Sequence, residues 1–275
     1  MKKIIVVGLG LIGGSIAKAL KRNTNHEILG FDIQEETMLD ACSLKVIDRK
    51  ADLEDIRHAD VIFLCTYPKE AIDFVRRYQT DFPSDCIITD TCGIKTYICE
   101  QIKKIPGNFV FLGAHPMAGK EKKGFSASDP SIFIGASYII TPCGAPQDAI
   151  DKLSTLIRAM GFGKIILTTP EKHDRVIAFT SQLPHVLACA YVLSPTCEFH
   201  CGFSAGSYRD VSRVADINAE LWTHLFIENK EELTKEIDIL IHNLALFRDT
   251  LVEDKKENLN ELLQKAANIK RRDHV

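Results

Sequence analysis

The sequence lacks the long apolar runs, the strong charge bias and the low-complexity tracts that mark several classes of protein. No apolar run reaches the ~18 residues that a membrane-spanning helix needs, and no cleavable apolar segment precedes the first predicted strand. The net charge of −3 gives no sign of nucleic acid or a membrane surface as a partner. We therefore expect a globular, cytoplasmic protein of one large or two medium domains.

Disulfide bonds and metal sites are not indicated either. The nine cysteines are scattered along a long chain, unlike those of a small secreted disulfide scaffold, so we expect reduced thiols. The segment Cys197-Glu198-Phe199-His200-Cys201 is the one cluster of metal-ligand types. Because its spacing matches no familiar zinc pattern, we favour a structural role for it and predict no metal.

What the sequence does contain is a glycine-rich turn close to its start. The apolar run Ile4–Val7 leads into Gly8-Leu9-Gly10-Leu11-Ile12-Gly13 and then into a helical pattern. Gly8 suits a tight turn, Gly10 lets the backbone approach a pyrophosphate, and Gly13 lets the helix pack against the strand. The helix N-terminus favours the bound anion. The alternative is a glycine turn that precedes a helix by chance.

An acidic residue follows this turn at the spacing typical of dinucleotide-binding proteins. The predicted strand Glu27–Phe31 ends at Asp32, 19 residues after Gly13. A carboxylate there accepts hydrogen bonds from a ribose 2′-hydroxyl and repels a 2′-phosphate, so we predict NAD rather than NADP. The predicted cofactor-binding residues are Gly8, Gly10, Leu11, Ile12, Gly13, Asp32 and Thr66.

Further short apolar segments alternate with helical patterns up to about residue 168, which indicates a parallel sheet. Residues 61–65, 86–89, 109–113, 132–141 and 163–167 read as strands. Beyond them only helical periodicity remains. We predict the α/β class, with a Rossmann-type, mostly parallel sheet domain over residues 1–168 and an all-helical domain over residues 169–275.

An apolar stripe in the helical part exceeds what one surface helix of a small domain needs. Burial against a second copy of the chain would use this surface, and a purely intramolecular core is the alternative. The residues of the stripe are Trp222, Leu225, Phe226, Ile237, Leu240, Ile241, Leu244 and Phe247.

Three groups of residues could act on a substrate near the nicotinamide. His115 ends a predicted strand, where an imidazole that titrates near pH ~6.5 can accept a proton; the alternative is a histidine that satisfies backbone groups in a turn. His173 and His185 lie 12 residues apart in one predicted helix, which Pro184 could kink. Arg213 and Arg209 are four residues apart, and either could bind a carboxylate or face solvent.

Taken together, these motifs resemble those of the prephenate dehydrogenases over nearly the whole chain. The segments GLGLIGGS, HPMAGKE and SQLPH carry the resemblance, with HD at residues 173–174. The resemblance implies that His115 accepts the proton of the ring hydroxyl, that His185 contacts the substrate and that Arg213 binds its carboxylate. It also implies a homodimer formed through the helical domain. The further site residues that it implies for prephenate are Glu121, Gly206 and Trp222.

The chain departs from the family pattern at Gly93 in the segment DTCGIK, where many members have a serine that hydrogen-bonds the catalytic histidine. Thr91, Cys92 or a water would have to replace that serine. Gln182 replaces a common histidine. We expect neither a fused chorismate mutase nor an ACT domain.

The resemblance implies NAD-dependent oxidative decarboxylation of prephenate to 4-hydroxyphenylpyruvate, a step of tyrosine biosynthesis. Arogenate dehydrogenase is the nearest alternative, since the motifs do not separate the two substrates. A β-hydroxyacid dehydrogenase or imine reductase shares the layout but depends on a lysine or lacks a base. A dinucleotide-sensing protein without catalysis is the remaining alternative, although it would not need His115, His185 and Arg213 together.

Overall fold

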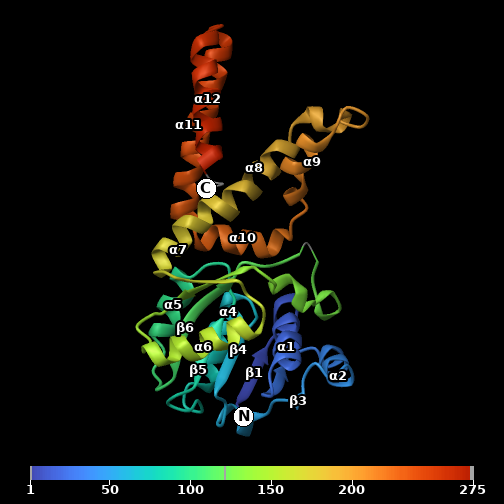
Figure 1. The fold of residues 1–275 in the computed structure, drawn as a ribbon, viewed down its shortest axis with the longest axis vertical. Helices are drawn as coiled ribbons and strands as arrows, with labels where there is room; N and C mark the ends of the chain where they lie inside the picture. The colour runs from blue at the N-terminus through green and yellow to red at the C-terminus, as the bar shows by residue number, and fades with distance from the viewer. Residues whose placement is uncertain (1, 121, 273–275) are drawn as a thin grey trace. The chain divides into compact units, whose positions relative to one another are not determined.

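The computed structural model describes residues 2–120 and 122–272, which form two compact units. The first unit comprises Met1–Ile177 and Asp216–Glu228, and the second comprises Ala178–Ala215 and Asn229–Val275 (Figure 1). The division into a cofactor domain and a helical domain at residues 168 and 169 stays a prediction. No helix of the described part is long and apolar enough to cross a membrane.

The first unit is built on an eight-stranded sheet, counted over the described residues, with the order β3-β2-β1-β4-β5-β6-β7-β8. All neighbours are parallel except β6 and β7. The mostly parallel α/β class that the sequence predicts is therefore confirmed. The strands are β1 (Lys3–Val7), β2 (Glu27–Phe31), β3 (Arg49–Lys50), β4 (Val61–Leu64), β5 (Ile87–Asp90), β6 (Val110–Pro116), β7 (Ser137–Thr141) and β8 (Lys164–Leu167).

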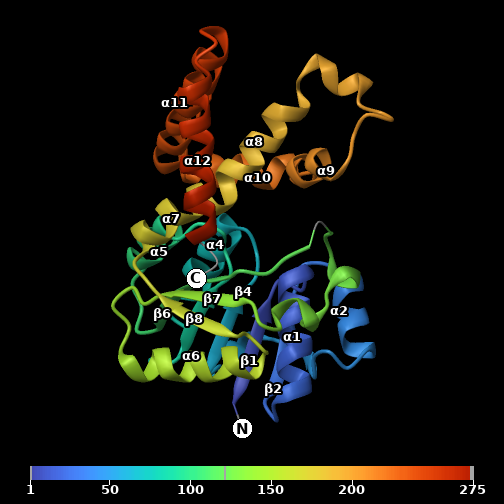
Figure 2. The same cartoon turned by 45° about the horizontal axis from the view of Figure 1, so that its top comes forward.

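Both faces of the sheet are covered by helices, because successive side chains of a buried strand point to opposite faces. In β1, Ile4 and Val6 enter one apolar core, while Ile5 and Val7 enter the other. The first core also receives residues of α1 (Leu11–Asn23), α2 (Glu35–Ser43) and α6 (Gln147–Ala159) (Figure 2). The second receives residues of α3 (Leu53–Ile56), α4 (Pro68–Tyr78) and α5 (Thr96–Lys103).

The strand register brings the residues that follow several strands to one edge of the sheet. Val7 pairs with Leu64, and Leu64 pairs with Asp90, so β1, β4 and β5 end side by side. β6 runs parallel to β5 and continues to Pro116. The turns after these strands therefore line the edge at which ligands bind in open α/β sheets.

One sequence prediction about an individual element is wrong. Residues 132–141 do not form one strand, since the 3₁₀ turn Pro130–Phe133 and Gly135, with φ +76°, precede β7. Residues 170–192 are helical, as predicted, and the helix is irregular just before Pro184, where the sequence suggested a kink. The π-helical segment Ala178–Gln182 separates α7 (Pro170–Ile177) from α8 (Leu183–Val192), and Pro184 lies in the first turn of α8.

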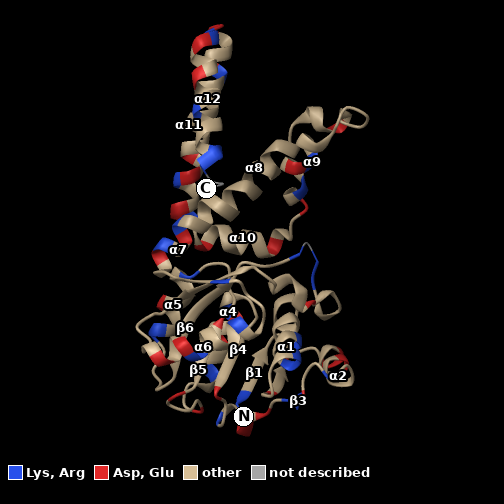
Figure 3. Cartoon of the chain, in the orientation of Figure 1, with Lys and Arg blue, Asp and Glu red and all other residues tan. Residues whose placement is uncertain are grey.

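The second unit is helical and exposes much apolar surface. α11 (Lys230–Val252) and α12 (Lys256–Arg272) lie side by side as a hairpin (Figure 1), and α8 carries no charged residue (Figure 3). α9 (Gly206–Ser212) and the 3₁₀ segments Pro195–Phe199 and Arg213–Ala215 complete the unit. Its half- or more than half-exposed large apolar side chains include Leu193, Phe199, Phe203, Ile239, Ile241, Leu244, Leu251, Leu263 and Ile269.

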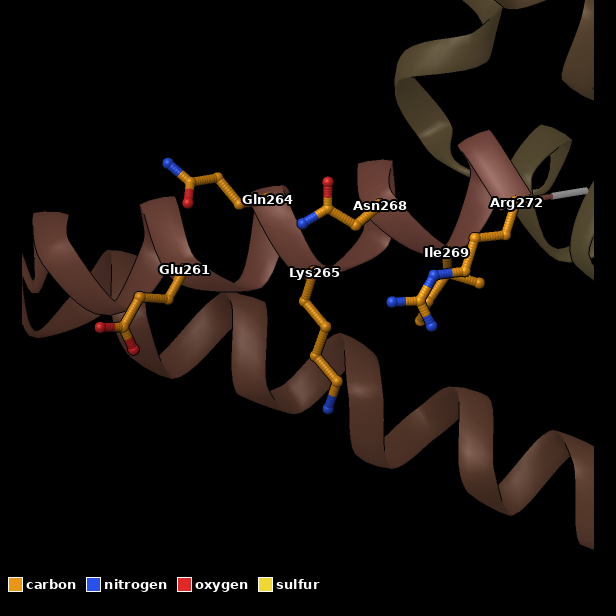
Figure 4. Close-up of a pocket in the computed structure, with 6 residues that line it drawn as sticks. All are labelled: Glu261, Gln264, Lys265, Asn268, Ile269 and Arg272. Atoms are coloured by element: carbon orange, nitrogen blue, oxygen red, sulfur yellow. The ribbon is translucent and has the colours of Figure 1, made fainter.

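One helix of the second unit also borders a hollow of about 550 Å³. The hollow is a surface groove, since α12 alone supplies its walls. The residues that line it are Glu261, Gln264, Lys265, Asn268, Ile269 and Arg272 (Figure 4).

Candidate functional site

The glycine turn connects β1 to α1 in a conformation that needs glycine. Gly8 has φ +83°, where other residues are strained. A Cβ on Gly13 would lie 1.8 Å from the carbonyl oxygen of Gly8, whereas a Cβ on Gly10 would meet no atom within 4 Å. Leu11 and Ile12 are the first two residues of α1, where backbone N–H groups have no partner within the helix and favour a bound anion.

Asp32, which follows β2, is hydrogen-bonded to this glycine turn. Its Oδ2 accepts a hydrogen bond from the amide of Leu9 at 2.7 Å, and its Oδ1 accepts one from the amide of Gln34 at 2.8 Å. Each carboxylate oxygen keeps a second lone pair, so Asp32 can still accept a hydrogen bond from a ribose hydroxyl. The carboxylate therefore both shapes the turn and presents negative charge beside it.

Thr66, which follows β4, adds a polar group at the turn. Its Cγ2 lies 2.7 Å from the position of a Cβ on Gly8. Its hydroxyl is buried and has no hydrogen-bond partner among the described residues. A buried hydroxyl without a partner is costly. The open space at Gly10, the N-terminus of α1 and this hydroxyl fit a bound dinucleotide.

His115 lies in β6 and is the first member of a hydrogen-bonded chain of three side chains. Its Nδ1 is 2.9 Å from Nε2 of His173, and Nδ1 of His173 is 2.7 Å from Oδ1 of Asp174. Both partners are buried, while His115 is half-buried. His173 and Asp174 belong to α7 of the same unit.

Backbone amides define the direction of this chain. The Asp174 carboxylate accepts hydrogen bonds from the amides of Lys95 at 2.8 Å and Thr96 at 2.7 Å. These donors and His173 lower the pKa of Asp174 despite its burial, so the carboxylate is ionised and can only accept. His173 must then donate from Nδ1 and accept at Nε2, which makes His115 donate from Nδ1. Nε2 of His115 is thereby left without a proton.

Burial keeps His115 neutral. Loss of hydration is the main reason that its pKa lies well below the usual value, and the neighbouring His173 and Lys95 lower the pKa further. A neutral imidazole whose Nε2 carries a lone pair is a proton acceptor. No hydrogen bond to that nitrogen is made by any described residue, so it is available to a ligand.

A buried ion pair holds the strands around His115. The ammonium of Lys95 hydrogen-bonds the carboxylate of Asp90 and, at 2.6 Å, the carbonyl of Ala114. Both charged side chains are fully buried. Asp90 also accepts hydrogen bonds from the amides of Ala114 and Cys92, each at 2.9 Å. The pair thus joins the end of β5 to the residue before His115.

The segment after β5 does not supply the hydroxyl partner that the family pattern suggests for His115. Gly93 has no side chain, and a Cβ there would lie 3.5 Å from Leu225 of α10 (Ala219–Glu228). The Thr91 hydroxyl points to the carbonyl of Leu64 at 3.4 Å, and the Cys92 thiol points to that of Thr66 at 3.7 Å. His173 is the partner of His115 instead.

The remaining predicted site residues are distributed over both units. Trp222 lies in α10 of the first unit, with its ring centroid 5.4 Å from that of Phe226. His185, Gly206 and Arg213 belong to the second unit. Glu121 lies outside the described residues.

His185 and Arg213 occupy defined positions in the second unit. Nδ1 of His185 is 2.7 Å from the carbonyl oxygen of Ser181, in the π-helical segment, so its Nε2 points elsewhere. Arg213 directly follows α9, and Gly206 is the first residue of that helix. The structure brings His115 together with His173, and it assigns His185 and Arg213 to a different unit from His115.

The cysteine and histidine cluster at residues 197–201 makes local contacts. The Cys197 thiol is 3.4 Å from the hydroxyl of Tyr208, and the ring of His200 stacks on that of Tyr208 at 4.4 Å. No group of three or more potential metal ligands occurs in the described part of the chain. Structural contacts are thus sufficient to account for these side chains.

Sequence reasoning singled out His173 and Asp174 but did not identify them as partners of His115, and it missed Asp90 and Lys95. Asp90 and Lys95 stand in the segment DTCGIK, five residues apart, and His173 with Asp174 forms the pair HD. A carboxylate that ends a buried apolar strand, followed by a lysine, was the available signal. Which histidine would meet His115 was not visible from spacing, because 58 residues separate the two.

Comparison with known proteins identifies the family of the chain. Residues 16–167 match the nucleotide-binding domain of prephenate dehydrogenase, and residues 169–265 match its dimerization domain. The cyclohexadienyl dehydrogenase of Zymomonas mobilis is 31% identical over 94% of this chain and 92% of its own length.

Two solved structures have the same fold, and each superposition includes almost all of this chain and of the solved chain. The arogenate dehydrogenase of Synechocystis has a TM-score of 0.86 at 28% identity and covers 99% of each chain. The prephenate dehydrogenase of A. aeolicus, in complex with hydroxyphenyl propionate and NAD+, has a TM-score of 0.86 at 27% identity, over 100% of this chain and 99% of that one.

The eight-stranded sheet and its match to a nucleotide-binding domain of dehydrogenases define a dinucleotide-dependent dehydrogenase. Matches over both parts of the sequence identify it more closely. The chain belongs to the prephenate dehydrogenase family.

We predict that Gly13→Ala prevents stable folding of the glycine turn, because its Cβ would lie 1.8 Å from the Gly8 carbonyl oxygen. Thermal unfolding should show a loss of several degrees or an insoluble product, since overpacking costs about 1–3 kcal/mol or more. Gly10→Ala is the matched control, since its Cβ meets open space. It should keep the wild-type Tm and weaken only NAD binding. Equal Tm values for both variants would contradict the contact.

Proposed function

We propose that the protein catalyses the NAD-dependent oxidative decarboxylation of prephenate to 4-hydroxyphenylpyruvate, in tyrosine biosynthesis. The observation that carries this proposal is the unprotonated Nε2 of His115, held in position by His173 and Asp174. Prephenate has a hydroxyl at ring carbon 4, whose proton must leave as the carbon–hydrogen bond breaks. A neutral, oriented imidazole suits this removal.

Residues of the first unit would hold NAD. Gly8, Gly10 and Gly13 shape the turn, the amides of Leu11 and Ile12 face the pyrophosphate, and Asp32 accepts from the ribose. Thr66 supplies a buried hydroxyl for the cofactor. Bound NAD supplies the acceptor for the hydride. The carboxylate of Asp32 favours NAD over NADP through charge repulsion.

His115 accepts the proton of the ring hydroxyl at Nε2. The positive charge that forms on its ring is stabilised through His173 by the ionised Asp174, so the chain of three groups favours the transition state over the resting state. Electrons of the breaking bond between carbon 1 and its carboxylate then aromatise the ring, and CO₂ leaves. Aromatisation makes the reaction effectively irreversible.

We assign recognition of the substrate to residues that match the family motifs. Arg213 binds a carboxylate of prephenate with its planar guanidinium group, and His185 contacts the substrate through Nε2. Gly206, Trp222 and Glu121 border the substrate. Arg209 is the alternative to Arg213, since both lie at the end of the α9 region.

Arogenate is the second candidate substrate, and it differs from prephenate only in an amino group on the side chain. The similarity to an arogenate dehydrogenase and to a cyclohexadienyl dehydrogenase supports it. His115 would act identically on both molecules, because the reacting ring is the same.

We also propose a homodimer formed through the second unit, in the cytoplasm. The match of residues 169–265 to a dimerization domain and the exposed apolar residues of α11 and α12 support it. Apolar surface of this extent is typical of protein–protein interfaces.

The overall reaction should be measured as NADH absorbance with purified protein, NAD and either prephenate or arogenate. We expect turnover of prephenate and a larger kcat/KM for prephenate than for arogenate. A larger value for arogenate would reassign the substrate. Absence of NADH with both substrates, from folded protein that binds NAD, would contradict the proposed function.

We predict that His115→Asn lowers kcat by about 10²- to 10⁴-fold, the usual contribution of a general base, with NAD affinity little changed. His58→Asn, at an exposed position of the same unit, is the control and should retain activity. Since burial lowers the pKa of His115, wild-type kcat/KM should fall only as the pH drops below ~6.5. An acid limb above pH 7 or an active His115→Asn enzyme would refute the assignment.

We predict that Arg213→Ala mainly raises KM for prephenate. Loss of a charged hydrogen bond worth roughly 1.5–3 kcal/mol corresponds to roughly a 10- to 100-fold increase. Arg209→Ala is the matched control and should leave KM within a few-fold. If the two variants exchange these results, Arg209 is the carboxylate ligand.

A further inference from the structure

Two cysteines lie close to Thr141, which pairs with Gly113 of β6, in an arrangement that the proposed reaction does not use. Cys99 is buried in α5, and Cys143 is exposed in the turn after β7. Both sulfurs approach the hydroxyl of Thr141, at 3.6 and 3.9 Å. Although 44 residues apart in sequence, the two thiols therefore share one polar contact.

The two thiols also face a common hollow that small solutes can enter. The hollow has a volume of about 270 Å³ and is open to solvent. Lys103, one turn after Cys99 in α5, contributes an ammonium group to its wall. Further lining residues are Ile102, Phe109, Gly144 and Pro146.

We propose that Cys143 and Cys99 form a peroxide-reactive dithiol, in which Cys143 is the attacking thiolate and Cys99 the resolving thiol. Cys143 is exposed to solvent, whereas Cys99 is buried. The protonated Cys143 thiol donates to the Thr141 hydroxyl oxygen at 3.9 Å. Once ionised, its sulfur can accept hydrogen bonds from the Cys99 thiol, the Gly113 amide and the Thr141 hydroxyl, which are donors. An attacking cysteine needs such donors, because the thiolate is the reactive form.

The ionisation of the cysteines differs in the direction that this assignment requires. The hydrogen bond from Cys99 lowers the pKa of Cys143 to about 7 against the effect of burial, which favours the thiolate. The pKa of Cys99 is raised, chiefly by the same contact. Burial raises the pKa values of Cys65 and Cys86 to about 12, so those thiols stay protonated.

The chemistry is balanced with a hydroperoxide as the oxidant. The Cys143 thiolate attacks one peroxide oxygen, the O–O bond breaks, and the hydroxide that leaves is protonated to water, which gives a sulfenic acid. Cys99 then attacks the Cys143 sulfur and forms the S–S bond. The sulfenic hydroxyl leaves as water with the Cys99 proton. Two thiols are oxidised to one disulfide, and one hydrogen peroxide is reduced to two waters.

The position of the pair connects it to the framework of the candidate site. The Cys99 sulfur would lie 2.7 Å from a Cβ on Gly113, two residues before His115 in β6. The amide of Cys99 donates to the carbonyl of Lys95 at 2.9 Å. The Cys99 end of the dithiol therefore lies close to Lys95 and β6, which take part in the ion pair of the candidate site.

The first test is the pH dependence of alkylation by iodoacetamide on the full chain, read cysteine by cysteine by mass spectrometry. Cys143 should react with a midpoint near pH 7 and, at pH 7, several-fold faster than the exposed Cys42. Cys99→Ala should move the midpoint upward, since it removes the main donor. A midpoint above 8 in the wild type, or a rate at or below that of Cys42, would overturn the proposal.

The second test is treatment with hydrogen peroxide followed by alkylation of the remaining thiols. The wild type should yield a peptide pair joined by a Cys99–Cys143 disulfide. In Cys99→Ser, Cys143 should stop at a sulfenic acid that dimedone traps. Wild-type protein whose Cys99 and Cys143 both remain free while Cys42 is oxidised would refute the dithiol. The fluorescence of the single tryptophan, Trp222, checks that each variant is folded.

Discussion

The buried ion pair of Lys95 and Asp90 is the interaction on which the arrangement of the first unit's strand ends depends. Removing two charges from water costs several kcal/mol per ion, and only close pairing with further hydrogen bonds offsets that cost. Asp90 receives the Lys95 ammonium and the amides of Cys92 and Ala114, and Lys95 also reaches the Ala114 carbonyl. Neither Asp90 nor Lys95 can move without leaving a buried charge unpaired. The pair therefore holds the end of β5 against β6 next to His115.

The same lysine links this ion pair to the hydrogen-bonded chain of His115, His173 and Asp174 through its backbone. The amide of Lys95 donates to Asp174, and Asp174 in turn accepts from His173. The side chain thus sets the strands, while the main chain anchors the carboxylate that orients two histidines. This shared residue explains why a polar cluster is stable inside an otherwise apolar unit, where unsatisfied groups are costly.

Much of the fold could be predicted from the sequence because its signals are local. The glycine turn, the apolar strands and Asp32 each follow from spacing and composition over fewer than about 35 residues. Interactions between distant segments were not predictable in this way. Nothing local shows that His173 approaches His115 or that Lys95 is buried.

The error at residues 132–141 has the same origin. Residues 132–136 are apolar enough for a strand, yet Pro130 and Gly135 favour a turn there. Pro184 indicated an irregularity in the helix that contains it, but periodicity does not reveal that the irregularity is a π-helical segment. Periodicity reports which residues are apolar, but it does not report how hydrogen bonds are redistributed.

The environment of His115 imposes a compromise on its chemistry. Burial and Lys95 lower its pKa, which keeps the ring unprotonated at physiological pH but also makes it a weaker base. In the proposed reaction, the ionised Asp174 would compensate, because it attracts the positive charge that forms only as the proton arrives. The stabilisation would then act on the transition state and not on the resting imidazole. A carboxylate in direct contact with His115 would raise the pKa of its resting imidazole. Asp174 instead acts through His173, so in the proposed reaction His115 stays unprotonated at rest and its positive charge is still stabilised when it forms.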